Sequence, residues 1–244
     1  FSTKNTSLAS YDSALIDYIV IIFMIIAGTN FSLHYQALKG NFKAYLKNKE
    51  FKLFITIIFV SFVIICLDVY FNDHFGFLET IQYTLFQVIS ITTTTGYGTA
   101  DYEKWALTSQ VILLFLMFMG GCAGSTGGGM KVMRIYILAK FAYSEIIRLL
   151  HPSAVVPIRI GNNIVDRKTI SNIAGFFLIH LAITAFGILL MTFLGEDLDT
   201  SIGAVAATIN NIGPGIGIVG PTENYALIHD AGKWVLSLFM LIGR

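Results

Sequence analysis

The chain has 244 residues, a formal net charge of +1 and a mean hydropathy of +0.71. Only 13% of its residues are charged, whereas a soluble domain carries about 25%. This composition predicts an integral membrane protein and leaves no basic face for nucleic acid. The two cysteines, Cys66 and Cys122, lie in apolar or glycine-rich surroundings, which favours packing roles over a disulfide or a metal site.

The first third of the chain contains two apolar stretches and one short helical pattern. Residues 8–47 read as one long helix, and its apolar part (14–33) is long enough to span about 30 Å of hydrocarbon. Residues 51–71 form a second span. The pattern over 77–90 is too short to cross, and it leads directly into the polar segment 92–98.

The remaining two thirds contain a broken span, two further spans and a second short helix. Residues 105–119 form a half-span that the small residues of 120–129 interrupt, and a helix resumes over 130–151, where Pro152 ends it. β-branched residues around Gly161 predict a small hairpin within 155–166. A fourth span (170–194), a short helix (198–209), a polar segment (210–215) and a final span (225–242) follow.

The segment 92–98 reads Thr-Thr-Thr-Thr-Gly-Tyr-Gly at the end of a short helix. Extended residues there can point successive carbonyl oxygens at one axis, and glycine permits the backbone angles that this requires. The negative C-terminal end of the helix dipole favours a cation at the same place. An ordinary polar turn is the alternative for this segment alone. The predicted filter residues are Thr93, Thr94, Thr95, Gly96, Tyr97 and Gly98.

The order span, short helix, polar loop, span occurs twice, in residues 51–151 and 170–244. Irregular backbone at membrane depth is tolerated only where it is buried in protein or lines a water-filled path. Aligning Gly96 with Gly213 places Thr94 and Thr95 opposite Asn211 and Ile212, whose backbone carbonyls are therefore the expected cation ligands. The second set of predicted filter residues is Asn210, Asn211, Ile212, Gly213, Pro214 and Gly215.

The small-residue break at 120–129 predicts a flexible gate beneath the filter, with a site of close helix packing as the alternative. A phosphate-binding loop has little support because no Ser or Thr follows Lys131 and the flanks are membrane helix. Arg244 could donate to loop carbonyls and repel permeating ions, or it could reach the interface. The candidate gating residues are Gly120, Gly121, Gly124, Ser125, Thr126, Gly127, Gly128, Gly129 and Arg244.

Charge placement predicts the orientation. Of the 16 Lys and Arg residues, all but Lys4, Lys104, Lys233 and Arg244 fall within 39–52 and 131–168, so these two stretches are expected in the cytoplasm. Both filter loops then face outside. An acidic vestibule would raise the local cation concentration at their mouth, although each acid could equally be a solvated loop residue. The expected outer acids are Asp68, Asp73, Asp101, Glu103, Glu196, Asp197, Asp199 and Glu223.

The two filter segments, the glycine-rich break and Arg244 together resemble the Trk/Ktr/HKT superfamily of potassium transporters, most closely its bacterial TrkH type. The resemblance implies an all-α membrane protein in which span–pore-helix–filter–span repeats surround a pseudo-fourfold cation pore, with one spanning helix broken. Because the chain begins and stops abruptly, we expect an internal piece of a longer protein. Residues 1–50 would be the second span of a preceding repeat with a cytoplasmic linker, 51–152 a complete third repeat, 153–169 a cytoplasmic connector, and 170–244 a truncated fourth repeat.

The resemblance also implies the function. It predicts potassium uptake through a carbonyl-lined filter, gated by the intramembrane glycine-rich loop and an arginine. The alternative is an ion-coupled K⁺ or Na⁺ symporter that works by alternating access. Permeant K⁺ (and Rb⁺, with Na⁺ left open) is expected without an organic cofactor, and no nucleophile–base pair indicates an enzyme. The implied setting is multi-pass in a bacterial inner membrane, among lipids, as a homodimer with a cytosolic nucleotide-binding regulatory subunit.

Overall fold

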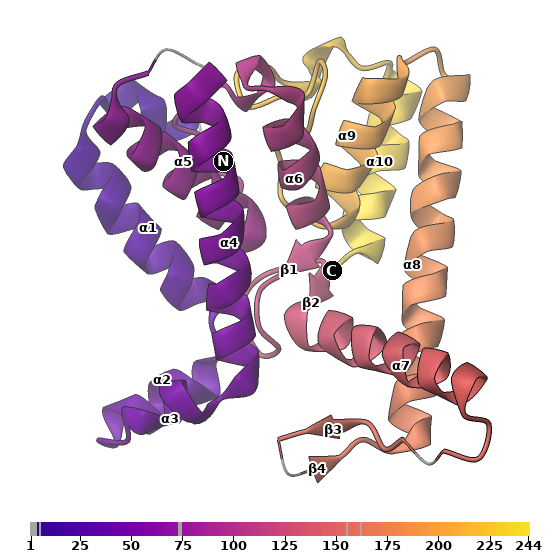
Figure 1. Cartoon of the computed structure of the whole chain (residues 1–244). Coiled ribbons are helices and arrows are strands. Elements are labelled where there is room, and N and C mark those ends of the chain that lie inside the picture. Colours follow the sequence, from indigo (N-terminus) through magenta and orange to yellow (C-terminus); the bar gives the residue numbers. More distant parts are fainter. Residues whose placement is uncertain (1–3, 5, 73–74, 155, 162) are drawn as a thin grey trace.

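The structure, a computed structural model, describes residues 4, 6–72, 75–154, 156–161 and 163–244. It is mainly helical, and its helices stand in two adjacent groups with α7 running across one end of the molecule (Figure 1). The predicted helical membrane architecture is confirmed. Expectations that rested on residues 1–3, Asp73, Val155 and Asn162 lie outside the described residues.

The first group opens with a bent helix rather than a continuous one. A 3-10 turn (Ser7–Tyr11) leads to α1 (Ala14–Gly28), then to α2 (Phe31–Leu38) and the short α3 (Lys43–Lys47). The prediction of one helix over 8–47 is therefore wrong. The chain bends by 102° between α1 and α2, so the predicted helix is broken at residues 29–30.

The bend occurs because other parts of the chain use the hydrogen-bonding groups that a continuous helix would need. The carbonyls of Ala27 and Gly28 accept from the backbone N–H groups of Thr126 and Cys122, at 3.2 and 2.9 Å. The side chain of Asn30 then caps α2. Since the competing donors lie about a hundred residues further along the chain, no local pattern could reveal the break.

The rest of this group follows the predicted order. The span α4 (Lys49–Asn72) precedes the short helix α5 (Phe77–Thr92), and a 3-10 turn (Tyr102–Lys104) leads to α6 (Leu107–Met117). The strand β1 (Met119–Gly120) then pairs in parallel with β2 (Met130–Lys131). This short parallel pairing joins the two ends of the glycine-rich segment 120–129, which lies between α6 and α7 (Val132–Leu150).

The second group also matches most of the predicted elements. The hairpin forms from β3 (Arg159–Ile160) and β4 (Asn163–Ile164), and α8 (Arg167–Phe193) and α9 (Leu198–Ile209) follow. The predicted span over 225–242 is shorter in the structure, because 225–227 is a 3-10 turn and the 13-residue helix α10 (Asp230–Ile242) starts where the His229 ring accepts from the N–H of Ala231. By length and composition α4 and α8 could cross a membrane, and the bent pair α1 and α2 would make a third span.

The two short helices occupy the most protected positions. All residues from 86 to 92 of α5 and from 203 to 209 of α9 are buried. In contrast, α1, α4 and α8 expose many large apolar side chains outward, as helices in contact with lipid do. The longer helices thus enclose α5 and α9 and hold their C-terminal ends inside the molecule.

The close approach of α1 to the end of α5 generates a stability prediction. A Cβ atom at Gly28 would lie 2.7 Å from Thr93 Cγ2 and 3.1 Å from Phe54 Cζ, whereas one at Gly175 in α8 would meet nothing within 4 Å. We expect Gly28→Ala to lower the free energy of unfolding by about 1–3 kcal/mol through overpacking. Gly175→Ala, the matched control, should leave it unchanged or raise it by up to about 1 kcal/mol. Thermal melting of the full-length protein in detergent measures both, and equal midpoints would contradict the packing described.

Candidate functional site

The helix α5 ends in a left-handed turn that closes onto its own last carbonyls. Thr94 N–H donates to Ile91 O at 3.0 Å, and Thr95 N–H donates to Ser90 O at 2.9 Å. This pair of bonds is the Schellman motif, in which the residue after the cap adopts positive φ. Here that residue is Thr94, with φ of 55°. The motif turns the chain sharply and starts the loop 93–98, which we call the first loop.

The helix α9 ends in the same way, and its loop (210–215) is the second loop. Asn211 N–H donates to Thr208 O at 3.1 Å and Ile212 N–H donates to Ala207 O at 2.8 Å. Asn211 also has φ of 55°. Thr94 and Asn211 are the residues that become equivalent when Gly96 is aligned with Gly213. The backbone geometry therefore repeats in the register that the sequence alignment uses.

The two central glycines serve different needs. Gly96 has φ of +74°, and a Cβ there would lie 1.8 Å from Ile212 O, so the first loop touches the backbone of the second loop. Gly213 has φ of +117° and open space around it. Glycine at 96 is thus required by both conformation and close contact, and glycine at 213 by conformation alone.

Four carbonyls of the two loops accept hydrogen bonds from side chains. The donor and acceptor pairs are Ser7 to Gly98, Ser90 to Tyr97, Tyr102 to Gly215 and Tyr225 to Gly213, at 3.1, 2.7, 2.6 and 2.6 Å. These bonds brace the loops against the surrounding helices. Of the twelve residues predicted to form the filter, these four therefore have carbonyls that are already engaged.

The remaining central carbonyls lack such partners. Among the described residues, no protein group donates a hydrogen bond to the carbonyl oxygens of Thr94, Thr95, Gly96, Asn211 or Ile212. Carbonyl oxygens inside a membrane protein need a polar partner, because an unsatisfied one costs several kcal/mol in hydrocarbon. A cation or water in the space between the loops would supply that partner.

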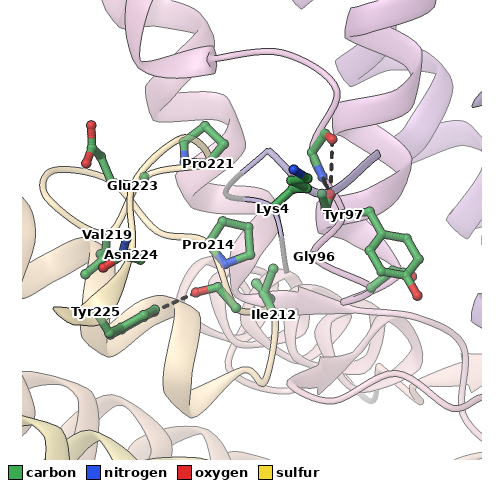
Figure 2. A pocket seen from close by; sticks show the side chains of 15 residues that line it. Lys4, Gly96, Tyr97, Ile212, Pro214, Val219, Pro221, Glu223, Asn224 and Tyr225 are labelled. Carbon is green, nitrogen blue, oxygen red and sulfur yellow. Dashed lines mark hydrogen bonds between the residues drawn. The ribbon is translucent and has the colours of Figure 1, made fainter. Parts of the chain in front are cut away.

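A cavity of about 250 Å³ opens beside the two loops (Figure 2). Thr95, Gly96 and Ile212 line it together with side chains from the segment before α10. Figure 2 shows the Tyr225 hydroxyl directed at Gly213, and it shows the Tyr97 ring pointing away from the cavity. The polar backbone of both loops therefore faces one shared space.

The predicted outer acids divide into two kinds. Glu223 lines the cavity, and Glu103 lies close to Gly220 of the same rim, where burial raises the pKa of its carboxyl group. By contrast, Asp68 accepts from Ser109 in the first turn of α6, and Asp197 caps α9. The second pair has structural roles at helix starts.

Residues 120–129, where the sequence predicts a gate and which we therefore call the gate segment, lie against both loops. A Cβ at Gly127 would lie 3.2 Å from Thr94 Oγ1, and one at Gly128 would lie 2.6 Å from Asn210 O. At Gly129, where φ is +62°, a Cβ would lie 3.0 Å from Asn210 Oδ1. A side chain at Gly128 would clash with the Asn210 carbonyl, one at Gly129 would be strained by its positive φ, and one at Gly127 would make a tight contact with Thr94.

The gate segment is docked through its backbone. Ala123 N–H donates to Glu50 Oε1 at 2.6 Å, and Gly128 N–H donates to Thr94 Oγ1 at 2.8 Å. Further bonds join the segment to the bend after α1. The break is expected to leave main-chain groups without partners in a local helix. In the structure, residues from distant helices supply partners for several of these groups. Glu50 was not singled out by sequence reasoning, although it is the one carboxylate within the first basic stretch.

Two cations donate hydrogen bonds to carbonyls of the gate segment. Arg244 Nη1 donates to Thr126 O at 3.2 Å, and Lys131 Nζ donates to Gly127 O. Both line a second cavity of about 560 Å³, together with Arg134. No carboxylate pairs with Lys131 or Arg244 in the part of the chain that the structure describes. Sequence reasoning proposed Arg244 and missed Lys131, whose only signal was its position directly after the break.

The comparisons with known proteins cover the whole chain. Residues 1–244 match the TrkH family model, described as a cation transport protein. The chain is 39% identical over 246 residues to the Trk system potassium uptake protein TrkH of Escherichia coli K12, and 38% identical over 249 residues to that of Vibrio parahaemolyticus. It spans about half the length of these relatives, 50% and 51%. The crystal structure of the potassium transporter TrkH from Vibrio parahaemolyticus is similar with a TM-score of 0.93 and 37% identity, covering 100% of this chain and 52% of that one.

The tyrosine braces generate a second stability prediction. Tyr102 is fully buried, so Tyr102→Phe would leave the Gly215 carbonyl without a donor in a site that water does not reach. We expect a loss of about 1–3 kcal/mol in the free energy of unfolding. Tyr225→Phe, the matched control, removes the donor to a carbonyl that lines an open cavity, and water can replace it, so about 1 kcal/mol or less is expected. Melting midpoints of the full-length variants measure both losses. A larger loss of stability in Tyr225→Phe than in Tyr102→Phe would contradict the conclusion that water can replace the Tyr225 hydroxyl but not the Tyr102 hydroxyl.

Proposed function

The chain belongs to the TrkH cation transport protein family, and from this premise we propose that it supplies two of the pore loops of a potassium uptake protein. One observation carries the proposal. At equivalent positions of both loops, carbonyl oxygens lie beside a common cavity and receive no hydrogen bond from the described protein. Such oxygens can replace the hydration shell of a passing ion.

The proposed ligands are backbone carbonyls. Those of Thr94 and Thr95 in the first loop and of Asn211 and Ile212 in the second would coordinate K⁺ or Rb⁺, with Gly96 contributing from the same row. In a bacterial inner membrane with the basic segments inside, the potential supplies about 2.3 kcal/mol per charge per 100 mV for uptake. No chemistry at a side chain is needed for this role.

The second loop departs from a threonine-rich filter, yet its side chains point elsewhere. Asn210 Nδ2 donates to Ala206 O at 2.9 Å, and Asn211 Nδ2 donates to Met240 O on α10 at 3.2 Å. Both amides thus serve the protein framework. The carbonyls of Asn211 and Ile212 accept no hydrogen bond from the described protein, which supports a contribution of this loop to the same filter.

We also propose that the gate segment closes the path below the filter and that Arg244 keeps it closed. The segment lies directly beneath both loops, and Arg244 binds its Thr126 carbonyl. A guanidinium group without a paired carboxylate would repel a cation that leaves the filter. Release of this contact would open the path and remove the charge from it.

The alternative, an ion-coupled symporter, would need the loops to open alternately to the two sides. Two loops braced by helix-end motifs and tyrosine hydroxyls favour a fixed filter over a moving binding site. In the full-length protein, ⁸⁶Rb⁺ flux that scales with the driving force and is independent of a proton or Na⁺ gradient would distinguish the pore from the symporter.

The resemblance to the Trk/Ktr/HKT superfamily implies two protein partners, and we propose both here. The structure places both basic segments at the same end of the molecule, where α2, α3, β3 and β4 lie (Figure 1). A cytosolic nucleotide-binding regulatory subunit would dock on this end. A second copy of the membrane protein would complete a homodimer.

The filter proposal predicts a selectivity defect. In proteoliposomes that contain the full-length protein, K⁺ should compete with ⁸⁶Rb⁺ uptake much more strongly than Na⁺ or Li⁺. Gly96→Ala forces a Cβ into the Ile212 carbonyl, and we expect at least a tenfold loss of Rb⁺ flux or of preference over Na⁺. At Gly213 a Cβ would meet no other atom within 4 Å, so Gly213→Ala introduces backbone strain without a clash. It should therefore lose less Rb⁺ flux and less preference over Na⁺ than Gly96→Ala. If K⁺, Na⁺ and Li⁺ compete with ⁸⁶Rb⁺ uptake in Gly96→Ala as they do in the wild type, the first loop does not form part of the filter.

The gate proposal predicts a gain of function. Arg244→Ala, and separately a deletion of Gly127 and Gly128, should each raise ⁸⁶Rb⁺ flux several-fold, because the contacts that hold the segment are lost. Lys233→Ala, an exposed cation on α10 that pairs with Asp230, is the control and should leave the flux at the wild-type level. If both gate variants conduct like the wild type, the segment is not a barrier.

A further inference from the structure

Thr94 occupies a backbone conformation that its side chain disfavours. Its φ of 55° is left-handed, a region that β-branched residues rarely adopt. Glycine is the usual residue at this position of the Schellman motif. The equivalent Asn211 is one of the few residues that tolerate the conformation well. The first loop therefore carries local strain that a glycine at 94 would remove.

The Thr94 hydroxyl makes a contact that glycine could not provide. Its Oγ1 accepts the N–H of Gly128 at 2.8 Å, and Gly128 is buried. Within the described ranges, no other acceptor for this N–H is found. Val would keep the shape of the side chain and lose the acceptor, and the Gly128 N–H would then be buried without a partner.

The second loop lacks an equivalent contact. The Asn211 side chain reaches Met240 O on α10, and the gate segment packs closely against Asn210 of this loop at Gly128 and Gly129. Among the described residues, no side chain of the second loop makes a hydrogen bond to the gate segment, whereas Thr94 of the first loop does. One hydroxyl connects the turn that orients the filter carbonyls to the middle of the gate segment.

We propose that Thr94 is a positioning residue whose hydroxyl holds the gate segment against the filter. This inference rests on the proposed gating role of residues 120–129. With the segment docked, the Gly128 N–H stabilises the strained turn at Thr94. When the segment leaves, its N–H passes to water and the turn loses its brace. Closure of the gate and the geometry of the first loop are therefore coupled through a single hydrogen bond.

The test uses the full-length protein in proteoliposomes and three variants. Thr94→Val removes the acceptor and keeps the β-branched shape, and it should raise ⁸⁶Rb⁺ flux roughly tenfold. Thr94→Ser keeps the hydroxyl and should bring the flux back toward the closed level. Thr94→Val combined with the deletion of Gly127 and Gly128 should conduct no more than the deletion alone, because the bond is already absent there.

The outcomes separate this inference from the gate proposal. If the deletion raises flux and Thr94→Val does not, the segment is a gate and Thr94 does not hold it. If neither raises flux, both proposals fail. If Thr94→Val changes the Rb⁺/Na⁺ ratio and leaves the total flux unaltered, Thr94 only shapes the filter and the inference is overturned.

Hydrogen exchange in the unmodified protein gives a check that needs no variant. The Gly128 amide should exchange at least tenfold more slowly than its intrinsic rate while the pathway is closed, because its N–H is bonded and buried. Exchange at the intrinsic rate would overturn the inference even if Thr94→Val did not fold.

Discussion

The structure depends on where the main-chain hydrogen bonds go when a helix ends inside a membrane protein. At the ends of α5 and α9 the last turn is closed by the chain itself, which frees the next carbonyls to point away from the helix. Side-chain hydroxyls then fix the outer part of each loop. What remains are a few oxygens with no protein donor in the described structure, in loops that these hydrogen bonds hold in place. Selective binding of a dehydrated ion needs this combination of rigid support and unused acceptors.

The parts of the fold that could be predicted from sequence are those that local patterns decide. The helix α9 runs from Leu198 to Ile209 as expected, because Asp197 caps it and the polar Asn210 and Asn211 end it. The hairpin over 159–164 follows from β-branched residues on either side of Gly161. The alignment of the two loops also followed from sequence, and the equal φ values of Thr94 and Asn211 support it.

The parts that could not be predicted are those that distant groups decide. The bend after Gly28 exists because the N–H groups of Cys122 and Thr126 donate to carbonyls of α1. The sequence of residues 14–38 contains no pattern that predicts these donors. The roles of Glu50 and Lys131 likewise depend on a gate segment that folds back between two helix groups. Sequence reasoning predicted a gate at the broken helix from its composition, but it could not name the groups that satisfy its backbone.

The two loops are connected to the proposed gate, residues 120–129, in different ways. The gate segment comes from the same repeat as the first loop, so Thr94 and Gly128 are joined through one helix pair and a short ladder. The second loop instead ties its Asn211 to α10, whose end carries Arg244 back to the gate segment at Thr126. The two loops thus reach the segment by different routes, one through a hydroxyl and one through a helix and a charge. Both connections end at the same ten residues, 120–129, which is why we propose this segment as the point of control.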